Sequence, residues 1–279
     1  MPIKRAILWT LFWIGLALAF NFGIYWFSGT EKALQFFGGY IIEQSLSVDN
    51  LFLFLMIFSS FGIPGTHQRR ILNYGIIGAI ILRLVFILLG SAVVNRFHWV
   101  LYVFGALLIV SGIKMFAKHD EGSQNFANNK ILKLLSKIIP VTKELHGDRF
   151  FLRKNNILYA TPLLAVLVLV EFSDIIFAID SIPAIFSITT DPFIVFTSNL
   201  FAILGLRSMY FVLEKLHSLF RYVQYGVALI LTLTGVKLLI LVFHIEVPLV
   251  ASILTIFTIL VISVLASIFH KEKPEPQNH

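Results

Sequence analysis

Long apolar runs dominate the chain, and short polar segments separate them. A membrane-spanning helix needs about 20 mainly apolar residues. Runs of about that length lie near 6–27, 37–58, 71–94, 97–117, 157–180, 193–213, 219–241 and 247–269. The first run is longer than the apolar core of a secretory signal peptide, so we interpret it as a retained span. The pattern predicts an all-α polytopic membrane protein with about eight transmembrane helices and one integral domain over residues 1–279.

Two of the predicted spans contain residues that disturb a regular helix. Gly38 and Gly39 open the second span, and Pro183 follows Asp180 in the fifth. Proline lacks a backbone N–H and clashes with the carbonyl four residues earlier. We therefore expect a helix break near Pro183.

Lysine and arginine lie mostly on one side of the predicted spans. With a cytoplasmic N-terminus, sixteen of the 22 basic residues fall in cytoplasmic segments, and only Lys32 and Arg96 fall on the other side. Cytoplasmic loops of membrane proteins carry such an excess. The bias predicts both termini in the cytoplasm, and it explains the net charge of +7 without nucleic-acid binding.

The composition supports a membrane protein and excludes several kinds of chemistry. Hydrophobic residues make up 58% of the chain and charged residues 13%, whereas soluble domains have about 45–50% and about 25%. The absence of cysteine excludes disulfides, thiolate metal sites and iron–sulfur clusters. The chain has no phosphate-binding loop of the Walker type and no Gly-x-Gly-Asp motif of intramembrane aspartyl proteases, so we expect no enzyme.

The two halves of the chain resemble each other at a nearly constant offset. The aligned pairs, 123 to 125 positions apart, are Gly112 with Gly235, Lys114 with Lys237, Arg83 with Arg207 and Asp49 with Asp174. Each unit, repeat A at about 37–117 and repeat B at about 157–241, holds three spans, so the second is inverted relative to the first. Spans 6–27 and 247–269 flank the repeats. Inverted repeats are typical of secondary transporters.

A polar cytoplasmic linker at 118–156 joins the two repeats. Within it, residues 129–140 place apolar side chains on one helical face. This segment is either an interfacial helix on the membrane surface or part of a plain basic linker.

Five carboxylates lie inside otherwise apolar runs, and they are the main candidates for function. A charged group in the bilayer costs roughly 3 kcal/mol on insertion scales, so it normally faces the protein interior and marks an ion path, a proton relay or a buried ion pair. The candidate metal ligands are Glu43, Asp49, Asn50, Glu171, Asp174 and Asp180. The supporting polar groups are Ser47, Ser181, Arg83, Arg207 and Asn199.

The acids outnumber the arginines Arg83 and Arg207 within the spans. Either some acids carry protons, or a cation completes the site. Alternatively, each arginine pairs with an acid and only stabilises packing. Histidines fall in loops, tails or span ends, so the ligands are oxygen atoms, which suit magnesium, calcium or manganese better than copper or zinc.

The most distinctive strings are EQSLSVDNLFLFL (43–55), VEFSDIIFAIDSIPAIF (170–186) and TDPFIVFTSNLFAILGLRSMYF (190–211). With them the chain resembles the TerC/Alx family of bacterial membrane proteins, and most of all its Alx branch. The family is grouped with LysE-like transporters built from inverted repeats. The resemblance implies export of manganese across the inner membrane along the acidic residues.

We therefore expect a secondary transporter that exports a divalent cation, manganese first, in exchange for protons. Its expected partners are membrane lipid, the metal ion and protons, with no nucleic acid and no resident cofactor, and nothing in the sequence identifies a protein partner. Other members of the family are linked to tellurite resistance or to metal loading of secreted proteins. The alternative is a non-transporting accessory membrane protein of the metal or tellurite stress response.

Overall fold

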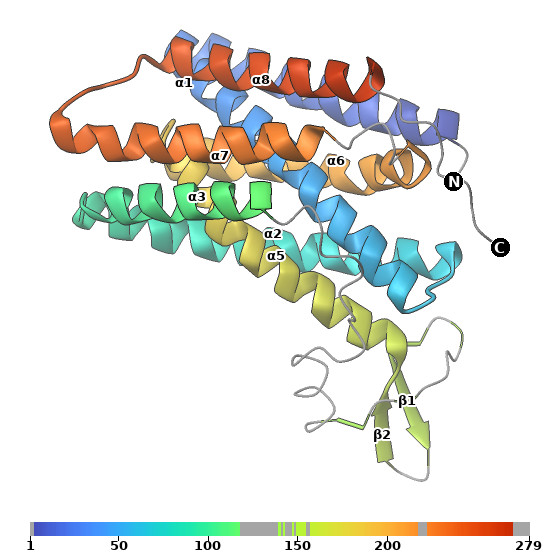
Figure 1. Cartoon of the computed structure of the whole chain (residues 1–279). Helices are drawn as coiled ribbons and strands as arrows, with labels where there is room; N and C mark the ends of the chain where they lie inside the picture. Colours follow the sequence, from blue (N-terminus) through green and yellow to red (C-terminus); the bar gives the residue numbers. More distant parts are fainter. Residues whose placement is uncertain are drawn as a thin grey trace.

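The computed structural model describes residues 3–117, 139–140, 142, 147, 149–154, 157–216 and 222–269. Its helices are α1 (Ile3–Ser60), α2 (Gly65–Arg96), α3 (Val100–Ala117), α5 (Pro162–Phe186), α6 (Pro192–Leu216), α7 (Val223–Ile240) and α8 (Leu249–Phe269), with a 3-10 turn η3 (Leu241–Phe243) after α7. Among the described residues, six helices are long and apolar enough to cross a membrane, and α3 is shorter. The prediction of a helical membrane protein is confirmed (Figure 1).

Helix α1 contains the first two predicted spans, and it is broken at Gly29. The φ of Gly29 is 87° and its ψ is 175°, a backbone region that is essentially restricted to glycine. The rings of Phe20 and Phe36, on either side of the break, have centroids 5.5 Å apart. A straight helix would separate these residues by about 24 Å. The two arms, residues 3–28 and 30–60, therefore fold back on each other (Figure 1).

The two irregularities predicted from the sequence are not helix breaks. Helix α1 continues through Gly38 and Gly39, which instead allow close packing. A Cβ atom on Gly39 would lie 2.8 Å from the Ser198 Oγ atom of α6. The predicted break near Pro183 is wrong, because α5 continues to Phe186. Pro183 lies in the last turn of the helix, so the one hydrogen bond that it removes, to the carbonyl of Ile179, is lost close to the end of α5 and the helix still continues to Phe186.

A small antiparallel hairpin precedes α5, and the sequence analysis did not predict it. Strand β1 (Phe151–Lys154) pairs with β2 (Ile157–Ala160), with Phe151 opposite Ala160. The fifth helix therefore begins at Pro162 rather than near residue 157. Residues 129–138, which hold most of the predicted interfacial helix, lie outside the described part of the chain.

Helices α3 and α7 lie side by side in an unusually close contact (Figure 1). A Cβ atom on Gly105 would be 2.8 Å from the backbone oxygen of Gly235, and one on Gly112 would be 2.7 Å from that of Ala228. The 123-residue offset of the predicted repeat converts the first contact into the second. The seam between α3 and α7 thus has the reciprocal contacts that an approximate two-fold relation requires.

The backbone conformation of Gly29 generates the first testable prediction. Gly29→Ala introduces a side chain at φ 87°, and we expect it to lower the free energy of unfolding by about 1–3 kcal/mol. Gly23→Ala is the matched control, because Gly23 lies in the first arm of the same helix with open space around its Cα. Thermal unfolding of the purified protein in detergent measures both. Equal stability of the two variants would contradict the break at Gly29.

Candidate functional site

A polar layer crosses the middle of the bundle between two apolar clusters. Helix α2 contributes Leu72 to one cluster and Ile87 to the other, and Arg83 lies between them. Helix α5 contributes Val170 and Ala178 in the same way, with Asp174 between them. Hydrocarbon side chains therefore pack on both sides of these two charged residues, and the site is shielded from water.

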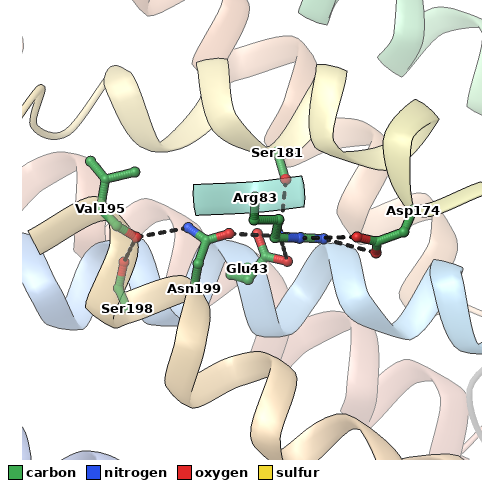
Figure 2. Close-up of polar contacts among 7 residues, drawn as sticks. All are labelled: Glu43, Arg83, Asp174, Ser181, Val195, Ser198 and Asn199. Carbon is green, nitrogen blue, oxygen red and sulfur yellow. Dashed lines mark hydrogen bonds and ion pairs between the residues drawn. The ribbon is translucent and has the colours of Figure 1, made fainter. Parts of the chain in front are cut away.

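Arg83 is the centre of this layer, and its side chain is fully buried. Its guanidinium donates hydrogen bonds to Glu43 of α1 and to both carboxylate oxygens of Asp174, at 3.4 and 3.5 Å (Figure 2). It also donates to Ser181 Oγ at 3.3 Å and to Asn199 Oδ1 at 2.6 Å. One side chain thus connects α2 with α1, α5 and α6.

The backbone of α6 fixes the orientation of Asn199. The side-chain amide of Asn199 donates to the carbonyl oxygen of Val195 at 2.9 Å, and Ser198 Oγ donates to the same oxygen at 3.0 Å (Figure 2). The Oδ1 atom of Asn199 is therefore turned toward Arg83. The position of this acceptor is therefore set by α6 itself.

The ionised cluster carries more negative than positive charge. Glu43 and Asp174 supply two carboxylates, both buried, against the single guanidinium of Arg83. A buried charge must be paired, and removal of one partner typically costs about 3–5 kcal/mol. The cluster is thus close to neutral only with one additional positive charge, from a proton or a cation.

Several buried oxygen atoms near the cluster lack a partner among the described residues. On α1 these are Glu43 Oε2, Ser47 Oγ and Asn50 Oδ1. The spacing of four and three residues places them on one face of the helix. On α5, Glu171 Oε2 is also unpartnered. Such atoms are costly to leave unsatisfied, and they offer hard oxygen ligands.

Glu171 lies beside Asp174, and none of the basic groups in the described part of the chain forms an ion pair with it. It lines a cavity of about 20 Å³ together with Asp174, Gly75 and Ala79, which is room for about one water molecule. A Cβ atom on Gly78 would overlap the Glu171 carboxylate. Glycine at position 78 therefore lets this carboxylate pack directly against α2.

Two predicted site residues lie away from the cluster. Asp180 accepts a hydrogen bond from Ser111 Oγ at 2.8 Å and lines a separate groove between α3 and α5 that also contains Lys114. Arg207 is exposed and donates to Asn73 Oδ1 at 2.5 Å. Arg207 therefore contacts an amide, whereas Arg83, with which the sequence aligns it, also contacts two carboxylates.

The predicted metal ligands are not gathered into one shell in the described part of the chain. No group of three or more histidine, aspartate or glutamate side chains there could hold a metal ion. The backbone of Asp49 lies in α1, and the position of its side chain is outside the description. The sequence identified Arg83 and Asn199 only as supporting groups, although together they organise the cluster. The signal for Arg83 was its isolated positive charge in an apolar run.

Helices that are long and apolar enough to cross a membrane, with a buried charged layer between them, define a multi-pass integral membrane protein. The chain belongs to the TerC family of integral membrane proteins, whose family model matches residues 28–275. This is not a known enzyme family.

Relatives cover nearly the whole chain. A protein of Escherichia coli (strain K12) named "Putative membrane-bound redox modulator Alx" is 46% identical over 271 residues, which are 94% of this chain and 84% of that protein. A Salmonella typhi protein of the same name is 48% identical over 272 residues, with the same coverage. The "Uncharacterized membrane protein STKORF319" of Myxococcus xanthus is 46% identical over 268 residues, 96% of this chain and 83% of that protein. No solved structure matches this chain.

The shared guanidinium generates the second prediction. Glu43→Gln and Asp174→Asn should be coupled in a double-mutant cycle by about 0.5–3 kcal/mol, because both carboxylates contact Arg83. Asp174→Asn and Asp180→Asn should be additive within about 0.5 kcal/mol, because Asp180 lies in a different groove. Chemical unfolding of the three single and two double variants in detergent measures this. Additivity in the first pair would contradict the cluster.

Proposed function

We propose that the protein is a secondary transporter that exports a hard divalent cation, with manganese as the favoured ion. The observation that carries the proposal is the buried cluster of Glu43, Asp174 and Arg83, which has an excess of carboxylate in the middle of a membrane bundle. Ionisable residues at such a depth are costly and are typical of ion pathways.

The choice of ion depends on ligand chemistry and on the family resemblance. The unpartnered oxygens of Glu43, Ser47, Asn50 and Glu171 are the hard ligands that magnesium, calcium and manganese accept. The resemblance of residues 43–55 and 170–186 to the Alx branch favours manganese among them. The names of the relatives attribute redox modulation to those proteins, but these 279 residues contain no cysteine for thiol chemistry.

We propose eight membrane crossings arranged as two inverted three-helix repeats. The two arms of α1 supply two crossings, and the second arm forms the first repeat with α2 and α3. Helices α5, α6 and α7 form the second repeat. The reciprocal contacts of Gly105 with Gly235 and of Gly112 with Ala228 support this arrangement.

The loops support the alternation of these crossings. The Lys32 ammonium contacts Asp191 at 2.5 Å, and Ser91 Oγ donates to the backbone oxygen of Thr190 at 2.9 Å, so two predicted outer segments lie together with the predicted outer end of α2. Partial burial would raise the pKa of Asp191, but Lys32 and nearby backbone N–H groups hold it below its ordinary value. The positive-inside bias then places both termini on the cytoplasmic side of the bacterial inner membrane.

Coupling to protons follows from the charge of the cluster. The same carboxylates can bind either a metal ion or protons, and metal binding to protein carboxylates releases protons. An inward proton gradient would then drive metal outward by exchange. A pair of inverted repeats supplies the two access states that this exchange needs.

The alternative is an accessory membrane protein that transports nothing and acts in the metal or tellurite stress response. One observation favours it. A guanidinium already occupies the space between Glu43 and Asp174, and no group of three acidic or histidine side chains in the described residues could hold a metal ion. A purely structural ion pair would have the same appearance.

Transport by the purified protein is the third prediction. Proteoliposomes with an acidic lumen should accumulate manganese while a trapped pH dye reports alkalinisation, and an uncoupler should prevent accumulation. Glu43→Gln and Asp174→Asn should each reduce the rate of manganese uptake more than about tenfold. Loss of a residue that only supports a metal ligand already costs about 10–100-fold in affinity or activity.

Glu246→Gln is the matched control, because Glu246 is an exposed acid between η3 and α8. It should transport like the unmodified protein. Manganese uptake that both cluster variants retain would make the cluster structural. The absence of any flux in the unmodified protein would favour the accessory role.

The orientation gives the fourth prediction. Reporter fusions at His146 and His279 should both report a cytoplasmic position, whereas insertion of a reporter beside Glu246 should report the opposite side. In the eight-span arrangement, an odd number of crossings separates Glu246 from each of the two fusion sites. A cytoplasmic signal beside Glu246 would require a different number of crossings.

A further inference from the structure

The guanidinium of Arg83 lies where a metal ion shared by Glu43 and Asp174 would lie. It contacts both carboxylates and is fully buried. A hard cation and a guanidinium are alternative partners for the same carboxylate oxygens. The two therefore compete for this position.

We propose that Arg83 is an internal substitute for the transported cation. It pairs with Glu43 and Asp174 while the transporter is empty, with a proton supplying the second positive charge, and it leaves them when the metal binds. The inference rests on the proposed function. Arg83 then has a further role, because it allows the metal-free transporter to change its access state.

The structure provides neutral acceptors to which the guanidinium can remain bound. Asn199 Oδ1 lies 2.6 Å from it and Ser181 Oγ lies 3.3 Å from it, whereas the contacts to Asp174 are 3.4 and 3.5 Å long. The Asn199 amide is held by the backbone of Val195 at 2.9 Å. A small shift toward Asn199 would thus release Asp174 first without leaving Arg83 unpartnered.

A row of unpartnered oxygen atoms begins at Glu43 and continues along α1. Glu43 Oε2, Ser47 Oγ and Asn50 Oδ1 lack partners among the described residues and share one face of α1. Seven residues of helix span about 10 Å, which is too long for the coordination shell of one ion. The three atoms therefore form a row that approaches the cluster from the Ser60 end of α1, the cytoplasmic end in the proposed orientation.

The physical reason for an internal cation is the cost of an empty site. Without metal and without Arg83, two carboxylates would remain unpaired in surroundings of low polarity, which is strongly unfavourable. A transporter in that condition would be held in its metal-bound form. Exchange of one metal ion for another would continue, but net export would stop at the empty return step.

The test compares two modes of transport in Arg83→Gln. Proteoliposomes loaded with unlabelled manganese should still take up radioactive manganese by exchange, whereas net uptake driven by a proton gradient should be lost. Manganese should also bind the purified variant at least about tenfold more tightly, because its internal competitor is gone. Arg96→Gln, an exposed arginine at the end of the same helix, should change none of these values.

Each outcome decides the proposal. If exchange and net uptake of Arg83→Gln fall together and manganese binding is not tighter, Arg83 is structural and the proposal is wrong. If the unmodified protein shows neither exchange nor net uptake, the transporter function itself fails. Should Arg83→Gln not fold, Arg83→Lys keeps the charge with fewer donors. It should bind manganese more tightly than the unmodified protein, and equal or weaker binding would overturn the inference.

Discussion

The structure depends on how one buried guanidinium is paired. Arg83 lies in the apolar interior of α2 and must find acceptors there, because no water is available in a bilayer to solvate it. Its partners come from α1, α5 and α6, so these helices must approach α2 at one level. The apolar clusters above and below can repack with modest cost, but this layer admits few arrangements. The ion cluster therefore sets the register of the four central helices.

The helices could be predicted from the sequence with some ends in error by up to seven residues, but the breaks in them could not. The lengths of the apolar runs predicted α2, α6 and α8, because a membrane-spanning helix must be as long as the hydrocarbon core of the bilayer is thick. Gly29 and Gly38 look alike in sequence, yet only Gly29 has a backbone conformation that requires glycine. Gly38 instead packs against Ile188 and Ile253. Which glycine breaks a helix depends on its neighbours in space, and these are distant in the sequence.

The candidate site was predictable in its residue types and not in its grouping. Asp174 and Asp180 both stand out as acids in an apolar run, but six residues place them about 120° apart around α5. One contacts Arg83, and the other contacts Ser111 of α3. The alignment of Arg83 with Arg207 was also misleading about environment, because one side chain is buried and the other exposed. Positions that align between the two halves of a sequence can thus differ in their surroundings.

The seam between α3 and α7 is too closely packed to contain a path for an ion. Gly105 and Gly235 bring backbone against backbone so closely that not even a methyl group would fit. A hydrated ion could not pass between these two helices, because it is far larger than the space between their backbones. The seam also resists opening, since any separation would lose contacts along its whole length. If the protein transports a cation as proposed, the path must lie away from this seam, where α1, α2, α5 and α6 meet around Arg83.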